Sequence, residues 1–272
     1  MEHFSNKTVL VTGAASGIGR ETALAFARQG ATLVICDVDK ARLEETADSA
    51  RALGRKVMAR VVDVADRNAM RSFSEEVHKD HAVDVLVNNA GVALTGGLLD
   101  TSLEDWDWII GINLNGVIHG CHFFVPKMVE RKSGYVVNVS SVAGYLGTGI
   151  LAAYCTTKFG VLGLSEALRE ELHPHGVGVA TICPGVVNTP IVEANRLRGR
   201  YATNDMRTRS RALYNKRNYG PERVANAIVE AVLRRKAVVP VTPEAWAIYW
   251  MKRLAPKTMA TVGRVLVKQA GG

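Results

Sequence analysis

Lys7-Thr-Val-Leu-Val-Thr12-Gly-Ala-Ala-Ser-Gly-Ile-Gly19 joins a short apolar run to a segment with helical periodicity. Glycines in such a turn let the chain bend tightly and let a pyrophosphate approach the backbone and the helix N-terminus. A glycine-rich turn alone is weak evidence, because it also occurs in ordinary strand-to-helix connections. The strand before it and the amphipathic helix after it supply the context that the motif needs. The stretch therefore predicts the first βα unit of a dinucleotide-binding fold.

The rest of the chain repeats this alternation of short apolar runs, typical of buried parallel strands, with longer segments of helical period. The predicted strands are 7–12, 32–36, 56–62, 84–88, 134–139, 177–183 and 237–241. The predicted helices are 17–29, 40–53, 66–79, 103–130, 152–173 and 221–235. This pattern predicts an α/β protein with a single-domain, doubly wound (Rossmann) fold: a seven-stranded parallel sheet with helices on both faces.

Two segments depart from the alternation. Residues 188–220 are polar and directly follow a strand end, a position that suits a mobile lid over a substrate cleft. This interval contains Arg196, Arg198, Arg200, Arg207, Arg209 and Arg211. Residues 243–272 follow the last strand as a helical extension. We therefore assign 1–242 to an NAD-binding and catalytic domain and 243–272 to an extension of the same domain.

The extension has two helix-start signals. Pro243 is expected to begin a helix with Thr242 as its N-cap, and Pro256 to begin another. Large apolar residues recur in it at helical spacing: Trp246, Tyr249, Trp250, Leu254, Met259, Val262 and Leu266. Core packing or a subunit contact explains this stripe, and weak contact with a membrane surface is the alternative.

Composition and cysteine usage narrow the class of protein. A hydrophobic content of 47% with 25 glycines and few prolines is typical of a globular enzyme. There is no uninterrupted apolar stretch of roughly 18 residues and no signal-like N-terminus, so we expect a cytoplasmic protein. Four cysteines without a C-x-x-C pair are expected to be small buried hydrophobes: Cys36, Cys121, Cys155 and Cys183. His119 and His122 lack a suitably spaced third ligand, so we expect no metal.

The net charge of +8 is concentrated late in the chain, where residues 196–272 hold 17 Lys/Arg against 4 Asp/Glu. Such a segment indicates an anionic substrate, an acidic membrane, nucleic acid or a solvated face. We expect no nucleic-acid partner, because the arginines are not interleaved with stacking aromatics on a known motif.

The second strand ends at Asp37, 18 residues after Gly19. A carboxylate there accepts hydrogen bonds from the adenosine ribose hydroxyls and repels a 2′-phosphate, so NAD is favoured over NADP. The alternative is that Asp37 caps the next helix, and Arg20 and Arg42 are the residues that would attract a phosphate instead. Asp63-Val64 and Asn88-Asn-Ala-Gly91 end the next two strands beside the same site, where they suit the adenine and the ribose or form ordinary turns.

Tyr154 and Lys158 are four residues apart and therefore share one helix face. A free tyrosine has a pKa near ~10 and is a poor base at neutral pH, but a neighbouring cation favours the phenolate. Ser141 ends the fifth strand, 13 residues before Tyr154, where its hydroxyl is placed to hold the substrate oxygen. Asn113 is a polar residue within an apolar helical stretch, and a helix-kinking or interface role is its alternative.

Together these residues resemble the short-chain dehydrogenase/reductase family. The resemblance covers roughly 5–240 and rests on Thr12-x-x-x-x-Gly17-x-Gly19, Asn88-Asn-Ala-Gly91, Asn113, Ser141, Tyr154-x-x-x-Lys158 and Pro184-Gly185 in family order and spacing. It implies that Tyr154 is the general acid/base, that Ser141 polarises the reacting oxygen, and that Lys158 binds the nicotinamide ribose and lowers the tyrosine pKa. Asn113 would steady a water in the proton relay, and Ser140 fits less well than Ser141.

The resemblance also implies a cofactor site and an assembly. Pro184-Gly185-Val-Val-Asn-Thr189 is similar to the family's nicotinamide-contacting turn, with Thr189 on the carboxamide. The expected cofactor-binding residues are Gly13, Ser16, Gly17, Ile18, Gly19, Asp37, Asp63, Val64, Asn89, Ala90, Gly91, Tyr154, Lys158, Pro184, Gly185, Val187 and Thr189. A homodimer or homotetramer through the 103–130 and 152–173 helices is expected.

Three functions are compatible with these residues. The positions expected around the reacting carbon are apolar: Leu94, Val142, Tyr145, Leu146, Val187 and Ile191. They favour an NAD(P)-dependent oxidoreductase acting on a hydrophobic secondary alcohol or ketone of steroid, retinoid, terpenoid or fatty-chain type. The arginine-rich lid favours an acidic or acyl-thioester-linked ketone instead. The third candidate is a non-catalytic NAD-binding regulator.

Overall fold

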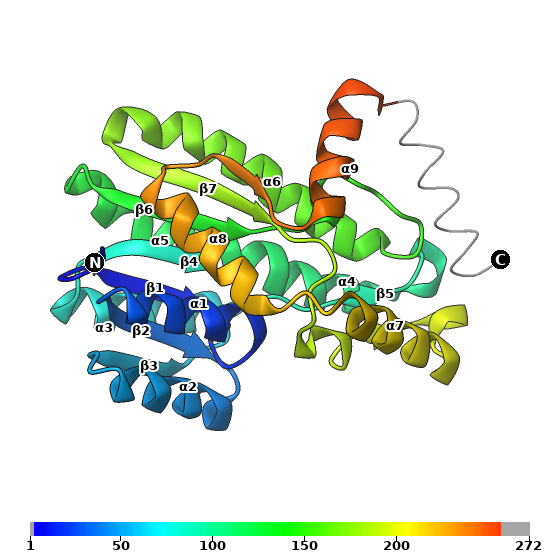
Figure 1. Ribbon diagram of the computed structural model, residues 1–272, viewed down its shortest axis with the longest axis horizontal. Helices are drawn as coiled ribbons and strands as arrows, with labels where there is room; N and C mark the ends of the chain where they lie inside the picture. The colour runs from blue at the N-terminus through cyan, green and yellow to red at the C-terminus, as the bar shows by residue number, and fades with distance from the viewer. Residues whose placement is uncertain (1–2, 257–272) are drawn as a thin grey trace.

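The computed structural model describes residues 3–256, and seven of its strands form one parallel sheet (Figure 1). The strand order is β3-β2-β1-β4-β6-β7-β9, so the order reverses between β1 and β4, where such folds bind their ligands. The strands of this sheet are β1 Thr8–Thr12, β2 Thr32–Asp37, β3 Val57–Val61, β4 Val83–Asn88, β6 Gly134–Val139, β7 Val177–Cys183 and β9 Val238–Pro240. The predicted fold class is confirmed.

Helices cover both faces of the sheet, because alternate residues of the strands are buried on opposite sides. Val9 and Val11 of β1 pack with one set of helices, whereas Leu10 packs with the other. The first set is α1 Gly17–Arg28, α2 Lys40–Ala52 and α8 Pro221–Leu233. The second is α3 Arg67–Asp80, α5 Gly116–Glu130 and α6 Ala152–Leu172. Aspartates cap α2 and α3, as their position before each helix suggests: Asp39 and Asp66.

The predicted helix 103–130 is divided. It comprises α4 Leu103–Ile110, a π-helical turn Gly111–Asn115 and α5. By length and composition this is the one candidate membrane span within the described residues, but half of its most apolar window is buried. Its buried face lies on the sheet, and His119, which was considered as a metal ligand, is buried there and hydrogen-bonds the Val64 carbonyl at 2.9 Å. All four cysteines are buried and free, as expected.

The interval 188–220 is more ordered than its polar sequence indicates. It contains α7 Asn204–Arg217 and a two-residue strand β8 Arg196–Leu197, which pairs in parallel with β5 Leu94–Thr95. The helix was not predicted because its residues are polar nearly all round, so they show no apolar stripe. Figure 1 shows α7 beyond the carboxyl ends of the main strands, where the lid was expected.

The C-terminal extension begins as predicted. Helix α9 spans Pro243–Leu254, and the Thr242 hydroxyl accepts a hydrogen bond from the Ala245 N–H. Tyr249 packs against Tyr145, whereas Trp246, Trp250 and Leu254 are exposed. The second helix expected from Pro256, with Met259, Val262 and Leu266, lies outside the described residues.

Candidate active site

The glycine-rich turn after β1 is built for a close backbone approach. Gly13 and Gly17 have φ of 67° and 53°, a left-handed conformation that other residues adopt with strain. A Cβ on Gly13 would lie 2.7 Å from the Ala90 Cα, and one on Gly19 would collide with the Gly13 carbonyl. Ser16 precedes α1 but gives it no side-chain cap, which leaves the first amides of the helix for an anion.

Thr12 and Asn89 lock the ends of β1 and β4 together at the point where the strand order reverses. The Thr12 hydroxyl accepts hydrogen bonds from the N–H groups of Asn89 and Ala90, each at 3.0 Å. The Asn89 amide in turn donates to the carbonyls of Thr12 at 2.9 Å and Gly13 at 3.1 Å. The side chain of Asn89 therefore shapes the glycine-rich turn, and its amide protons are used within the protein.

Asp37 lies at the end of β2 against the same turn. Its carboxylate accepts hydrogen bonds from the Ala15 N–H at 2.9 Å and the Asp39 N–H at 3.0 Å. The residue that caps α2 is Asp39, which accepts from the Arg42 N–H, so the helix-cap interpretation of Asp37 is wrong.

The residues that follow β3, Asp63 and Val64, make contacts typical of an ordinary turn. The Asp63 carboxylate is exposed and accepts a hydrogen bond from the Ala65 N–H at 2.9 Å. Val64 is buried, and a Cβ on Gly116 of α5 would approach its Cγ2 to 2.7 Å. The packing of Val64 therefore holds the loop after β3 against α5.

Tyr154 and Lys158 lie one turn apart near the start of α6, with the Lys158 Nζ 5.8 Å from the centroid of the phenol ring. The ring packs against a small buried cluster of Leu94, Ile109 and Ala153. Lys158 is buried and donates a hydrogen bond to the Val139 carbonyl at 3.0 Å. Gly91 adjoins this group, because a Cβ there would lie 3.5 Å from the Nζ.

Burial dominates the protonation of both groups. It lowers the pKa of Lys158 to about 8. It also raises the pKa of Tyr154, while a hydrogen bond with Ser141 acts in the opposite direction. In the protein alone, burial disfavours the phenolate of Tyr154 more than Ser141 favours it. The lowering of the tyrosine pKa by Lys158 stays a prediction.

The hydroxyls of the two serines that follow β6, Ser140 and Ser141, contact different parts of the protein. The Ser140 hydroxyl donates to the Lys158 carbonyl at 2.8 Å and so holds α6 in place. The Ser141 hydroxyl accepts from the Ala143 N–H at 3.1 Å, donates to the Pro184 carbonyl at 3.4 Å and lies close enough to Tyr154 to act on its pKa. The serine that the spacing favoured is therefore the one whose hydroxyl meets the phenol.

Asn113 lies in the π-helical turn, and most of the hydrogen-bonding groups of its side chain are bonded to other protein atoms. Its Oδ1 accepts from the Val92 N–H at 2.8 Å, and its Nδ2 donates to the Val92 carbonyl at 2.9 Å and the Thr157 hydroxyl at 3.3 Å. These bonds use both amide protons and leave one acceptor position of Oδ1 for a water. Its role in the proton relay stays a prediction.

The loop after β7 closes over the glycine-rich turn. A Cβ on Gly17 would lie 3.2 Å from the Thr189 Cβ, so Thr189 faces the start of α1. The Pro184 carbonyl accepts from the Val142 N–H at 2.8 Å, which ties this loop to the turn after Ser141. The predicted nicotinamide-contacting turn and the predicted catalytic residues thus meet at the carboxyl end of the sheet.

Some of the apolar residues expected around the reacting carbon contact other parts of the protein instead. Val187 belongs to the main core, and the Tyr145 hydroxyl donates to the Ala245 carbonyl at 3.1 Å while its ring packs on Tyr249. Leu94 packs near Tyr154, whereas Val142 and Ile191 are half-buried. Tyr145 is therefore a contact with the C-terminal helix.

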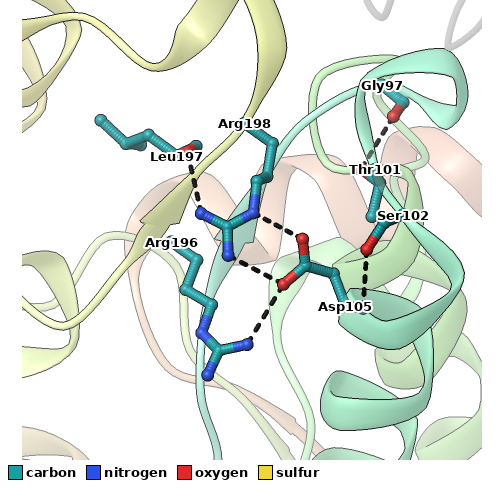
Figure 2. Close-up of polar contacts among 7 residues, drawn as sticks. All are labelled: Gly97, Thr101, Ser102, Asp105, Arg196, Leu197 and Arg198. Carbon is teal, nitrogen blue, oxygen red and sulfur yellow. Dashed lines mark hydrogen bonds and ion pairs between the residues drawn. The ribbon is translucent and has the colours of Figure 1, made fainter.

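The lid is fastened to α4 by a pair of arginines (Figure 2). Arg198 meets the Asp105 carboxylate with two of its nitrogens, and Arg196 donates to the same carboxylate at 3.1 Å while stacking 3.5 Å over the Trp108 ring. Asp105 is only 6% exposed, and the hydrogen bond from Arg198 is the main reason that its pKa is lowered.

The other lid arginines also have partners. Arg200 pairs with Asp100, Arg209 with Asp205 and Arg211 with Glu193. Arg207 donates to the Glu193 carbonyl at 3.3 Å. All six arginines singled out in the sequence are therefore engaged within the protein.

Three residues near the site were missed. Asp105 lies beneath the lid, Glu244 of α9 bonds the loop after β7, and Tyr214 of α7 is close enough to Tyr154 to influence its pKa. Each is brought to the site by contacts between distant segments. In the sequence, Asp105 and Glu244 look like ordinary acidic residues in the first turn of a helix. Tyr214 is not surrounded by any recognisable motif.

Comparison with known proteins agrees with this arrangement. The family model for short chain dehydrogenases matches residues 7–198. A probable oxidoreductase of Mycobacterium tuberculosis, EphD, is 44% identical over 277 residues, covering 97% of this chain and 46% of the relative. The chain thus spans about half the length of that relative.

Solved structures share the whole fold. A short-chain dehydrogenase/reductase from Burkholderia phymatum in complex with NAD is 30% identical, with a TM-score of 0.81 over 95% of this chain and 96% of that one. A short-chain dehydrogenase from Sphingobium yanoikuyae in complex with NADPH is 27% identical, with a TM-score of 0.78 over 94% and 95%. With the sheet, the glycine-rich turn and the Ser141, Tyr154 and Lys158 cluster in place, this chain belongs to the short-chain dehydrogenase/reductase family.

Proposed function

We propose that this protein is an NAD-dependent oxidoreductase of a hydrophobic secondary alcohol or ketone, of steroid, retinoid, terpenoid or fatty-chain type. The observation that carries the proposal is that the Tyr154 phenol lies close enough to the Ser141 hydroxyl for Ser141 to act on its pKa, beside buried Lys158 at the carboxyl end of the sheet. A non-catalytic NAD-binding regulator would not need Ser141, Tyr154 and Lys158 together. Gly91 adjoins both Asn113 and Lys158, and this grouping supports catalysis.

The residues fit a dinucleotide. The backbone at Gly13 and Gly19 leaves no room for a Cβ, and the first amides of α1 suit a pyrophosphate. Asp37 would hold the adenosine ribose, Lys158 the nicotinamide ribose, and Thr189 the carboxamide. When bound, the nicotinamide supplies or accepts the hydride.

The protein's own part is the movement of a proton at the Tyr154 Oη. Ser141 holds the reacting substrate oxygen beside this phenol, so the proton passes over hydrogen-bond distance. Burial raises the pKa of Tyr154 further above neutral pH, so formation of the phenolate requires added positive charge nearby. Lys158 would supply that charge together with a bound oxidised nicotinamide, which would link the base strength of Tyr154 to cofactor binding.

The partners of the lid arginines favour the hydrophobic substrate over the acidic one. An acyl-thioester or other acidic ketone would need free cations, whereas the six arginines have carboxylate or carbonyl partners. Leu94, Ile109 and Ala153 are fully buried and make the packing behind Tyr154 apolar. Val142 and Ile191, which are also expected around the reacting carbon, are half-buried and apolar, and they support a neutral, apolar substrate.

Replacement of Tyr154 by Phe tests the mechanism. The variant should lose nearly all turnover, since general acid–base catalysis contributes roughly 10²–10⁴-fold, while its dissociation constant for NAD⁺ should stay near that of the wild type. Turnover is followed by nicotinamide absorbance on neutral steroid and long-chain alcohols and, separately, on acyl thioesters. Retained activity of Tyr154→Phe would refute the mechanism, and turnover of the thioesters alone would refute the substrate class.

The choice of NAD over NADP rests on Asp37. The two arginines that would bind a 2′-phosphate are paired with carboxylates, Arg20 with Glu21 at 2.7 Å and Arg42 with Asp39 at 3.6 Å. Asp37→Ala should weaken NAD⁺ binding and lower the NAD⁺ to NADP⁺ preference about tenfold, because it removes a ribose hydrogen bond and a repelling charge. Titration calorimetry with both nucleotides measures the ratio, and an unchanged ratio would contradict the assignment.

A further inference from the structure

Glu244, in the first turn of α9, reaches out of the C-terminal extension to the loop after β7. Its Oε1 accepts a hydrogen bond from the Val186 N–H at 3.1 Å. Val186 lies between Gly185 and Val187 in the predicted nicotinamide-contacting turn. A side chain from the extension thus holds the backbone of the cofactor site directly.

Gly185 makes this approach possible. A Cβ at that position would collide with the Thr242 hydroxyl and would lie 2.5 Å from the Glu244 Oε1. Thr242 caps α9 and is itself buried, so the start of this helix is fixed against the loop. The glycine is needed here for close packing, since its φ lies outside the left-handed region.

The other carboxylate oxygen of Glu244 forms an ion pair with Arg217, the last residue of α7. The next part of the lid is bound to the same region, because the Asn188 N–H donates to the Tyr219 carbonyl at 2.9 Å and the Tyr219 hydroxyl donates to the Val241 carbonyl at 3.0 Å. Glu244 therefore stands between the end of the lid helix and the loop after β7.

The charge on Glu244 is well supported although the group is partly buried. Burial by itself raises its pKa, but hydrogen bonds from Arg217, its own N–H and the Val186 N–H outweigh that effect and leave the pKa below its usual value. The carboxylate is thus ionised at neutral pH and can hold a backbone amide and a guanidinium at once.

We propose that Glu244 is a positioning residue for the nicotinamide half of the cofactor site, and that its pairing with Arg217 couples the lid helix to that half. The inference rests on the proposed function. It follows that the C-terminal extension is part of the cofactor site, and that loss of Glu244 should affect the nicotinamide end of the dinucleotide and spare the adenosine end.

Binding of NAD⁺ and of ADP-ribose, which lacks the nicotinamide, tests this by titration calorimetry without any turnover. Glu244→Ala should raise the dissociation constant for NAD⁺ about tenfold, the usual effect of losing a hydrogen bond to a charged group. The constant for ADP-ribose should change less than about twofold. Glu244→Gln retains an acceptor for the Val186 N–H and should recover part of the NAD⁺ affinity.

Arg217→Gln separates the two halves of the contact. It leaves Glu244 on Val186 but removes the ion pair, so NAD⁺ binding should weaken less than in Glu244→Ala. Glu230→Ala is the matched control, because Glu230 pairs with Arg234 and Lys236 on the exposed surface of α8. Should Glu244→Ala fail to fold, Glu244→Gln and Arg217→Gln must still weaken NAD⁺ more than ADP-ribose.

Two results would overturn the inference: NAD⁺ binding of Glu244→Ala equal to wild type, or equal weakening of NAD⁺ and ADP-ribose, which would indicate a general structural role. Failure of the proposed function looks different. In that case the wild-type protein itself would bind neither NAD⁺ nor NADP⁺.

Discussion

At the scale of single residues, the site is a set of polar groups held in an apolar setting by backbone partners. The Val139 carbonyl holds the Lys158 ammonium, the Val92 backbone holds the Asn113 amide, and the Ser140 hydroxyl fixes α6 behind them. Identity and spacing of these residues were readable in the sequence. Their protonation was not, because the desolvation that raises the pKa of Tyr154 and lowers that of Lys158 depends on what packs around them.

Lys158 should make stability rise with pH in the nucleotide-free protein. Its pKa is about 8 when folded, against about 10.4 in an unfolded chain, so between these values the unfolded chain binds a proton that the folded protein does not. Compared with Lys158→Met, the wild type should gain about 1 kcal/mol in free energy of unfolding from about pH 8 to about pH 9. Urea unfolding of both proteins measures this difference in free energy of unfolding. The cysteines also titrate in this range in the unfolded chain, but they are present in both proteins, so their contribution cancels. A difference that stays flat or falls would contradict the lowered pKa.

At the scale of elements, the lid is a segment, residues 188–220, that carboxylates from elsewhere in the fold hold on both sides of α7. Asp105 of α4 fastens its start through Arg196 and Arg198, and Glu244 of α9 fastens its end through Arg217. The mobility that the polar sequence predicts for the lid stays a prediction. Two ion-pair contacts hold the segment in this structure, so any movement of the lid would have to break them or carry their partners along.

Asp105→Asn should loosen the lid start. Asn keeps the shape but cannot balance two guanidinium charges, so we expect a loss of about 1 to 2 kcal/mol in free energy of unfolding for this partly buried cluster. The KM for the alcohol should rise, while the dissociation constant for NAD⁺ stays unchanged because Asp105 does not touch the glycine-rich turn. Asp205→Asn, which removes an exposed pair with Arg209 on α7, is the control. Equal behaviour of the two variants would show that the cluster has no special role.

At the scale of the whole molecule, two of the exposed apolar areas within residues 3–256 suit contacts with other molecules. Ile118 of α5 and Phe159 of α6 are 41% and 39% exposed, and we propose that these helices form the contact of a homodimer or homotetramer. On α9, Trp246, Trp250 and Leu254 lie one turn apart and are exposed beside Lys252 and Arg253. Subunit contact and weak binding to an acidic membrane surface both stay proposals for that face.

Phe159→Arg should reduce the molar mass measured by light scattering during size-exclusion chromatography to that of a monomer, because it places a charge in the proposed contact. Leu53→Arg, at the end of α2 with a similar exposure of 40%, should leave the mass unchanged. A wild-type protein that is already a monomer would refute the assembly.

Sequence patterns alone were sufficient to predict the seven-stranded parallel sheet, the helices on its two faces and a candidate catalytic set. These features have local signatures: alternating strand and helix periods, glycines where the backbone must turn, and Tyr154 and Lys158 one helical turn apart. The folded arrangement was needed to show which partners the lid arginines have, that Asp39 caps α2, and that Glu244 reaches Val186. Such contacts join residues that are far apart in the chain, as Asp105 and Arg198 are. Because the packing of distant segments brings them together, no periodicity or motif around either residue indicates its partner.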